Sequence, residues 1–218
     1  MIGTRIIAAF CTTLALSVTT VAAETHTTEK VPIKVDVVAS GLEHPWGIEV
    51  LPDGAFLVTE RPGNMRLVKD GQVSEPVRGL PKITANGQGG LLDVALANDF
   101  DDSGTIFFTY SQPGRGGSGT AVARAILERD GLKARLENVE TIFSMNKKSR
   151  GGRHFGSRLS VADDDTIYFS IGDRGDADRA QDMRDHAGAI LRIHADGSVP
   201  ADNPYANDGS ALPELWSK

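Results

Sequence analysis

Cysteine is almost absent from this sequence, because Cys11 is the single cysteine among 218 residues. It lies in an apolar N-terminal stretch that is typical of a cleaved export signal. We therefore expect a mature chain without cysteine, which excludes disulfide bonds and thiolate metal sites.

Long apolar runs and an excess of positive charge are also missing. After the N-terminal stretch no segment is apolar enough to cross a bilayer, so we expect no membrane span after signal cleavage. The formal charge is −6 at pH 7, and removing the one charged residue of the signal, Arg5, makes it −7. A mildly acidic exported protein is a poor candidate for binding nucleic acid or anionic membranes.

The N-terminus has the parts of a secretory signal. Arg5 supplies the positive start, residues 6–21 are mostly apolar, and Val21-Ala22-Ala23 has the small residues that a signal peptidase requires. We predict a signal peptide at residues 1–23, a polar lead-in at 24–34 and one partial domain at 35–218. The mature protein is then expected to be periplasmic or secreted.

Three stretches of the domain share one design and recur about every 50 to 60 residues. Each has a glycine, a short apolar strand, an acidic turn and a second strand rich in β-branched and aromatic residues. The stretches are residues 47–60, 90–110 and 156–172. A repeat of this length is typical of the blades of a β-propeller or of another repeat array.

The segments between the repeats fit the outer strands of such blades. Lys69-Asp70-Gly71 contains a strong hairpin signal, and residues 190–194 predict another strand before a turn. Residues 121–128 are compatible with a strand or a short helix. Because no long helical period occurs, we predict an all-β fold with about three to four propeller blades. Closed propellers have about four to eight blades, so we expect a truncated sequence and an incomplete ring.

A predicted hairpin around Asp163-Asp164-Asp165 carries candidate catalytic residues. His154 precedes its first strand and Arg174 follows its second. Antiparallel strands return to the same end of a hairpin, so these two side chains can lie close together. The imidazole of His154 could act as a general base, or it could simply bond to the loop backbone.

Cationic residues crowd the entrance of this hairpin. They are Lys147, Lys148, Arg150, Arg153 and Arg158, with Arg174 at the exit. The guanidinium groups could hold a polycarboxylate or a phosphate through paired hydrogen bonds, and the interleaved glycines would let a flat ligand approach. Solvated arginines on an exposed loop are the alternative.

Gln88 lies in a glycine-rich stretch before the second repeat, at the place that residues 151–156 take in the third. Its amide could reach a central ligand, or the stretch could be an ordinary turn. Two other patterns predict hairpin turns rather than sites. The acidic runs at residues 99–104 and 163–165 lack EF-hand spacing, and the G-x-G-x-x-G match at 114–119 lies outside a βαβ unit.

Taken together, the motifs resemble the glucose/sorbosone dehydrogenase family of soluble sugar dehydrogenases that use pyrroloquinoline quinone (PQQ), and within it the aldose sugar dehydrogenase branch. The resemblance extends over about residues 35–218. Its motifs are GLEHPWG (41–47), ERPG (60–63), GQGGLL (87–92), RHFGSRL (153–159), GDRG (172–175) and DGSVPADNP (196–204).

The resemblance implies a six-bladed β-propeller with the quinone near its axis. His154 matches the family's catalytic base, which takes the proton of the sugar's anomeric hydroxyl while hydride passes to PQQ. Gln88 falls on a glutamine near the cofactor. Arg153 and Arg174 fall at pocket positions where the glucose dehydrogenase branch has Asp and Gln. PQQ is a polycarboxylate, which suits a cationic cluster.

The sequence departs from the family pattern after residues 212–217, where the family continues into Gly-His-Arg-Asn and then into calcium-binding loops. Calcium ligands are therefore expected beyond Lys218, and an unclosed ring would leave blade edges with unpaired backbone groups. We expect an enzyme that oxidises the C1 hydroxyl of aldoses to the lactone and passes electrons to an unknown acceptor, with this chain inactive alone. The alternative is a non-catalytic exported propeller module that binds a sugar or a protein partner.

Overall fold

The computed structural model describes residues 24–218. The predicted signal peptide, residues 1–23, lies outside the described residues. The described residues fall into two compact units, one that ends at Val38 and a second that extends over Ala39–Lys218. Within the described part, no helix is long and apolar enough to cross a membrane.

The described part of the first unit contains a small hairpin where the sequence predicted only a polar lead-in. Strand β1 (Glu24–Thr27) pairs antiparallel with β2 (Pro32–Val35), and every residue of both strands is exposed. The Thr28 hydroxyl closes the turn, because Oγ1 donates to the carbonyl of Val31 at 2.6 Å and accepts the Val31 N–H at 3.2 Å. Threonine and β-branched residues favour this extended conformation.

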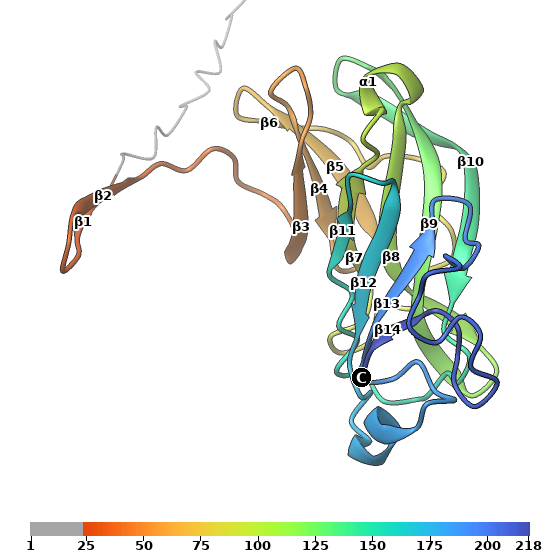
Figure 1. Ribbon diagram of the computed structural model, residues 1–218. Helices are drawn as coiled ribbons and strands as arrows, with labels where there is room; N and C mark the ends of the chain where they lie inside the picture. Colours follow the sequence, from red (N-terminus) through yellow and green to blue (C-terminus); the bar gives the residue numbers. More distant parts are fainter. Residues whose placement is uncertain (1–23) are drawn as a thin grey trace, which may run out of the picture. The chain divides into compact units, whose positions relative to one another are not determined.

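The second unit consists of three four-stranded antiparallel sheets, each of which follows the chain strand by strand (Figure 1). The first contains β3 (Pro45–Val50), β4 (Phe56–Glu60), β5 (Asn64–Lys69) and β6 (Gln72–Val73). The second contains β7 (Leu91–Leu96), β8 (Thr105–Gly114), β9 (Gly117–Asp130) and β10 (Lys133–Ser144). The third contains β11 (Leu159–Val161), β12 (Thr166–Ile171), β13 (Ala189–His194) and β14 (Leu215–Ser217). Helix α1 (Phe100–Ser103) and the 3-10 helix η1 (Ala177–Gln181) lie in connections.

These sheets are propeller blades, so the all-β prediction is confirmed and the predicted three to four blades resolve to three in the described residues. Residues 190–194 form the third strand of the third blade. Residues 121–128 belong to strand β9 and not to a helix. The acidic run at 99–104 contains α1 instead of a simple hairpin turn. The glycine-rich run at 114–119 is a hairpin turn, as predicted, with Gly114 paired to Gly117.

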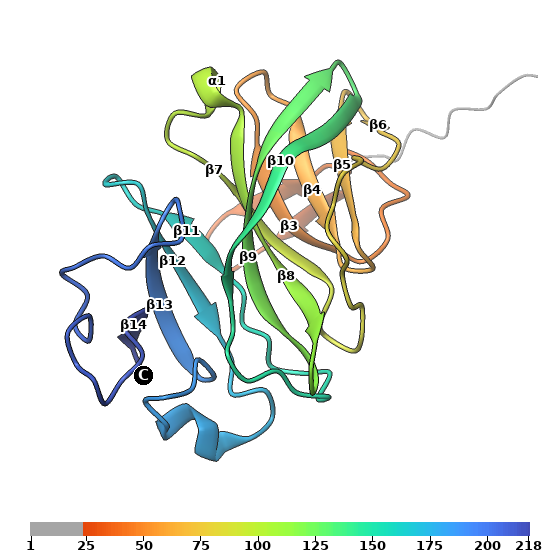
Figure 2. The ribbon, with the colours of Figure 1, turned by 90° about the vertical axis from the view of Figure 1, so that its right-hand side faces the viewer.

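Two hydrophobic cores lie between successive blades, which stand side by side in Figure 2. Leu57 of the first blade and Phe108 of the second belong to one core. Phe107 of the second blade and Phe169 of the third belong to the other. Because side chains alternate along a strand, adjacent residues of β8 enter different cores. The middle blade is thus covered on both faces, which explains why both faces of β9 carry apolar residues.

The first strands of the three blades lie beside one another, since β7 contacts both β3 and β11. The loops that enter β7 and β11 therefore meet at one end of this row. That end carries the predicted site residues.

Candidate functional site: a His–Asp pair at the loop end

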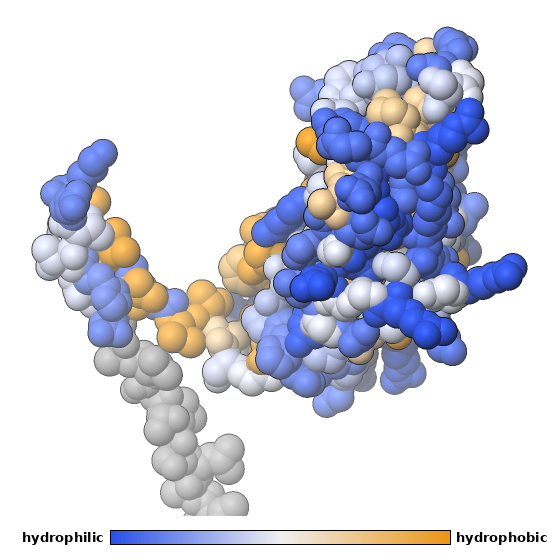
Figure 3. Space-filling model, turned by 90° about the horizontal axis from the view of Figure 1, so that it is seen from below, coloured by the Kyte–Doolittle hydropathy of each residue, from blue (hydrophilic) through white to orange (hydrophobic). Residues whose placement is uncertain are grey.

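Three loops meet at one end of the second and third blades: residues 86–90, 150–157 and 172–176. The first two precede β7 and β11, and the third follows β12. Figure 3 views the molecule from the end on which η1 lies in Figure 1, and the surface there is mainly hydrophilic. The geometry expected of an antiparallel hairpin, with its entrance and exit loops together, is therefore found.

Glycines allow these loops to approach backbone to backbone. The Gln88 N–H donates to the carbonyl of Gly152 at 2.7 Å, and a Cβ on Gly87 would collide with that same carbonyl oxygen. A Cβ on Gly172 would collide with the carbonyl oxygen of His154. Residues without a side chain are needed at both positions for the loops to meet.

His154 is held from two sides. Its backbone N–H donates to Oε1 of Gln88 at 2.7 Å, and its ring Nδ1 lies 2.6 Å from Oδ1 of Asp173. The backbone at His154 is left-handed, with φ at 53°. Its side chain is 49% exposed, and Nε2 has no hydrogen-bond partner among residues 24–218. The arrangement orients the ring and leaves Nε2 open to a ligand.

Asp173 acts on His154 as an ionised acceptor. The hydrogen bond from His154, followed by that from the Gly175 N–H at 2.7 Å, lowers the pKa of Asp173 below its usual value. A carboxylate on Nδ1 favours the tautomer that carries its proton there, so that Nε2 is the basic nitrogen. Sequence reasoning missed Asp173 as a site residue. The available signal was an acidic residue immediately after the strand that returns to the His154 end.

Arg174 is buried beneath the His154 loop. Only 3% of the residue is exposed, and its guanidinium donates to the carbonyl of Gly151 at 2.6 Å and to the carbonyl of Arg153. Its Cζ lies 3.4 Å from the ring centroid of Phe155, a cation–π contact. Burial lowers the pKa of Arg174 to about 10, which leaves the group cationic at neutral pH. The side chain holds the loop that carries His154, and its predicted contact with a cofactor stays a prediction.

Most side chains of the predicted cationic cluster already have a hydrogen-bond or ion-pair partner within the fold. Arg158 Nη1 lies 3.0 Å from Asp93 Oδ1, and its Cζ lies 5.0 Å from the centroid of the Trp46 ring. Lys148 Nζ donates to Gln112 Oε1 at 2.6 Å, and burial lowers the pKa of this lysine.

Arg150 and Arg153 are exposed, as are Lys147 and Arg158, but they differ from these two in their partners. Neither Arg150 nor Arg153 has a carboxylate within 4.0 Å in the described part of the chain. The side chain of Arg153 lies over Gly175, next to the Asp173 loop. These are the two guanidinium groups that remain available to an anionic ligand.

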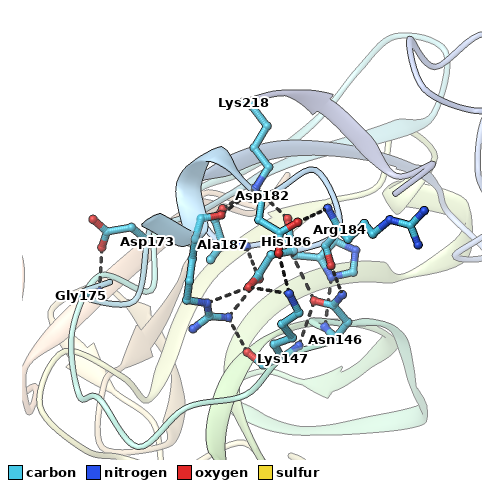
Figure 4. Close-up of polar contacts among 11 residues, drawn as sticks. Asn146, Lys147, Asp173, Gly175, Asp182, Arg184, His186, Ala187 and Lys218 are labelled. Carbon is cyan, nitrogen blue, oxygen red and sulfur yellow. Dashed lines mark hydrogen bonds and ion pairs between the residues drawn. The ribbon is translucent and has the colours of Figure 1, made fainter. Parts of the chain in front are cut away.

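A second polar network anchors the segment that follows Asp173 (Figure 4). Asp185 is almost fully buried and accepts from Arg179 at 2.8 and 3.0 Å, and Lys147 Nζ lies 2.7 Å from Asp182 and 3.5 Å from Asp185. Burial acts to raise the pKa of Asp185, but the bonds from Arg179 and from the Ala187 N–H outweigh it, and the net shift is downward. Lys147 is therefore part of this scaffold.

The chain end joins the same network. Lys218 Nζ donates to the carbonyls of Asp185 and Ala187 at 2.7 Å each and to that of Arg179 at 3.3 Å. Burial lowers the pKa of Lys218. These bonds fasten β14 to the segment around η1.

Away from these loops, a cavity of about 690 Å³ opens near the Asp163–Asp165 turn. Asn98, Arg124 and Glu140 are among its lining residues, and none of the predicted site residues lines it. No group of three or more His, Asp or Glu side chains within residues 24–218 is arranged to hold a metal ion.

Residues 42–218 match the model of a known family, described as Glucose / Sorbosone dehydrogenase. The chain belongs to the glucose/sorbosone dehydrogenase family. Aldose sugar dehydrogenase YliI of Escherichia coli is 36% identical over 188 residues, and the uncharacterized protein slr1608 of Synechocystis is 43% identical over 204 residues. Each alignment covers 85% of this chain but only 50% and 48% of the respective relative. This family member thus spans about half the length of the curated relatives it matches.

Solved structures agree with the blade assignment. The apo-form of the E. coli soluble aldose sugar dehydrogenase matches with a TM-score of 0.79 and 36% identity, covering 83% of this chain and 52% of that one. The PQQ-bound aldose sugar dehydrogenase of Streptomyces coelicolor matches with a TM-score of 0.69 and 26% identity, covering 83% and 51%. The similarity of this dehydrogenase-family chain is therefore to one half of a larger propeller.

Proposed function

We propose that this chain carries the catalytic base of a PQQ-dependent aldose dehydrogenase, with His154 acting on the C1 hydroxyl of the sugar. The observation that carries the proposal is the 2.6 Å contact between His154 Nδ1 and Asp173 Oδ1, with Nε2 left open at the loop end of the blades. Family membership over residues 42–218 supports the assignment to sugar oxidation.

The proton step follows from the geometry of the pair. His154 Nε2 accepts the hydroxyl proton, and the ionised Asp173 stabilises the resulting imidazolium through Nδ1–H. Gln88 fixes the main chain of His154, so the ring keeps its direction during the transfer. When bound, PQQ would accept the hydride from C1, the carbon that carries this hydroxyl.

The residues present fit a flat, anionic cofactor. Arg150 and Arg153 offer guanidinium groups without carboxylate partners among the described residues, and the amide nitrogen of Gln88 is free to donate while its Oε1 is bonded to His154. Guanidinium groups suit carboxylate ligands because of their paired donors. Arg174 contributes by holding the Gly151–Arg153 backbone, and a direct contact with PQQ is a further prediction for this residue.

Calcium and the remaining cofactor contacts are proposed to come from outside this chain, so we propose that the chain alone is inactive. The signal-like N-terminus supports export to the periplasm or the medium. The substrate is then an aldose met outside the cytoplasm.

The test is sugar oxidation with added PQQ, calcium and an artificial electron acceptor. We expect no turnover by the 218-residue chain, and turnover by a chimera that joins residues 39–218 to the C-terminal half of the E. coli relative. His154→Gln in the folded chimera should lower kcat by about 10²- to 10⁴-fold, the usual contribution of a general base. Lys133→Gln, on the outer strand of the second blade, is the control and should leave kcat unchanged.

Two results would contradict the proposal. Full activity of the folded His154→Gln chimera would remove His154 as the base. Oxidation by the 218-residue chain alone would show that half a propeller suffices. Equilibrium dialysis of the chimera measures PQQ binding independently of turnover. The double substitution Arg150→Gln and Arg153→Gln should weaken PQQ binding, whereas Lys133→Gln should not.

A further inference from the structure

The motif ERPG (60–63) places Arg61 directly after strand β4 of the first blade. The residue is half-buried, and its backbone N–H donates to the carbonyl of His44 at 3.0 Å. Within residues 24–218 no carboxylate lies within 4.0 Å of its guanidinium. Its Nη1 instead donates to the carbonyl of Gly87 at 2.5 Å, in the loop that enters the second blade. A cationic side chain of the first blade thus binds a main-chain group of the second.

Arg61 holds the loop of residues 86–90 near both of its ends. Its side chain binds Gly87 near the start of the loop, and its carbonyl accepts the Leu91 N–H at 3.1 Å just after the end. A Cβ on Gly90 would collide with the carbonyl oxygen of Arg61, so a residue without a side chain is needed for this approach. The loop is therefore attached to the first blade at two points, and Arg61 provides both.

The peptide group between Gly87 and Gln88 is bonded on both of its sides. Its carbonyl accepts from Arg61, and its N–H donates to the carbonyl of Gly152 at 2.7 Å. A hydrogen bond from a charged donor is stronger than one between neutral groups, and it polarises the peptide so that the N–H on the other side becomes a better donor. Because a rotation of this peptide would break both bonds, the two bonds together fix its plane.

Gln88 carries the orientation of this peptide to His154. Its side-chain Oε1 accepts the His154 N–H at 2.7 Å. Phe155 gives the two loops a second contact, because its ring lies where a Cβ on Gly89 would be. In the described structure no hydrogen bond joins Arg61 to His154 directly. The contacts run from the first blade, through the entry loop of the second, to the entry loop of the third.

We propose that Arg61 is a positioning residue for the general base His154. The inference rests on the proposed function, since it takes His154 as the base. Arg61 acts through the Gly87–Gln88 peptide and not by contact with the His154 ring. A general base must keep its nitrogen within hydrogen-bond reach of the hydroxyl, so a loosened loop slows proton transfer more than it weakens sugar binding. The first blade then contributes to catalysis without supplying a group that touches the substrate.

Hydrogen exchange of the His154 backbone amide, measured by NMR on the full chain, tests the geometry without cofactor or substrate. Arg61→Met keeps the apolar stem and removes the donor to Gly87. We expect the exchange to become about tenfold faster in this variant, because the bond from His154 to Gln88 is then formed less of the time. Arg61→Lys keeps a cationic donor, and since the guanidinium makes a single bond to Gly87, it should restore slow exchange at least in part.

Two controls separate a local effect from general destabilisation. Arg78→Met changes an exposed arginine that follows strand β6 and should leave the exchange of the His154 amide unchanged. The amides of Leu57 and Phe108, in core strands of the first two blades, should exchange as slowly in Arg61→Met as in the unsubstituted chain.

Turnover of the chimera described above gives the functional test. At saturating PQQ, Arg61→Met should lower kcat by about 10- to 100-fold and change KM for the sugar by less than about twofold, the pattern of a misplaced base. A double-mutant cycle then identifies the route. Gln88→Leu removes the side chain through which Arg61 acts, so Arg61→Met should lower kcat much less in the Gln88→Leu chimera than in the unsubstituted one.

Three results would overturn the proposal. Unchanged exchange of the His154 amide in Arg61→Met would show that Arg61 does not hold the loop. Fully additive effects of Arg61→Met and Gln88→Leu on kcat would show that Arg61 acts independently of Gln88, as a direct ligand of the cofactor would. A raised KM with kcat unchanged would place Arg61 in sugar binding instead.

Failure of the proposed function gives a different pattern. Full activity of the His154→Gln chimera would remove the base itself, whatever Arg61→Met does. Loss of activity in His154→Gln together with normal kcat in Arg61→Met would remove only the role of Arg61.

Discussion

The third blade has a buried arginine at each end, and the two are used differently. At the turn end Arg192, 6% exposed, is paired with the carboxylates of Asp164 and Asp202. At the loop end Arg174, 3% exposed, is bonded to backbone carbonyls and lies on the ring of Phe155, with no carboxylate partner among the described residues. The charge of the first is cancelled locally, whereas the charge of the second is not.

The comparison teaches that similar clusters of Arg and Asp in the sequence have different roles in the fold. At the turn end, the buried charge of Arg192 is paired with carboxylates of the same blade. The loop end keeps positive charge and holds three non-glycine residues, His154, Ser157 and Arg174, at φ values of 53°, 85° and 60°, whereas the turn end holds one, Asp165, at 63°. Left-handed backbone at such residues is uncommon and tends to occur at functional sites.

Replacing Arg174 should have the largest effect on stability. In Arg174→Met the carbonyls of Gly151 and Arg153 lose their donor, and the cation on Phe155 is lost, for a total cost of about 3 kcal/mol in the free energy of unfolding. Urea denaturation measures the change. Arg153→Met, at the exposed neighbour, should change stability by less than about 0.5 kcal/mol. Equal effects of the two substitutions would contradict a structural role for Arg174.

Replacing Arg192 should cost less, because its carboxylate partners are largely exposed. Asp164 and Asp202 have side-chain exposures of 56% and 74%. Water can solvate both after the change, so Arg192→Met should lower the free energy of unfolding by about 1–2 kcal/mol. The same denaturation experiment checks this. A larger loss of unfolding free energy in Arg192→Met than in Arg174→Met would contradict this prediction.

Acid should act on the turn end through Asp164. Hydrogen bonds from Thr166, followed by the bond from Arg192, lower the pKa of Asp164 from 3.8 to about 2. A carboxylate whose pKa is lower in the folded state than in the unfolded state stabilises the fold at pH values above the unfolded-state pKa. This stabilisation is lost as the pH falls toward the folded-state pKa. Asp164→Asn should therefore flatten the pH dependence of stability between about pH 4 and pH 2. Asp163→Asn is the control, and an equal flattening there would contradict the assignment.

The smallest expected change concerns the pairing at the loop end. The His154 hydrogen bond is the largest cause that lowers the pKa of Asp173. His154→Ala should therefore move the pKa of Asp173 upward, toward its usual value, with little loss of stability because both side chains are partly exposed. Carbon-13 NMR of the carboxyl groups measures the shift. An unchanged titration of Asp173 would show that the pair does not form in solution.

Much of the fold could be predicted because its signals are local. Strand alternation, the Asp-Gly turn and the acidic turn depend on neighbouring residues, so the three repeats and the all-β class were readable from the chain. Residues 121–128 were ambiguous, since their alanines favour a helix and only burial on both faces selects a strand. The meeting of His154 and Gly172–Arg174 was also predictable, because one hairpin joins them.

The sequence by itself determined the blades, the family motifs and the identity of the candidate base. Only the tertiary structure decided which cations are free, because the partners of the other cations are distant in the chain: Asp93 is 65 residues from Arg158, and Gln112 is 36 residues from Lys148. It also decided that Gln88, 66 residues away, binds the main chain of His154. Packing of successive blades brings these pairs together, and no local pattern encodes that distance. For the same reason the sequence could not distinguish Arg174, buried under the loop, from Arg153, exposed above it.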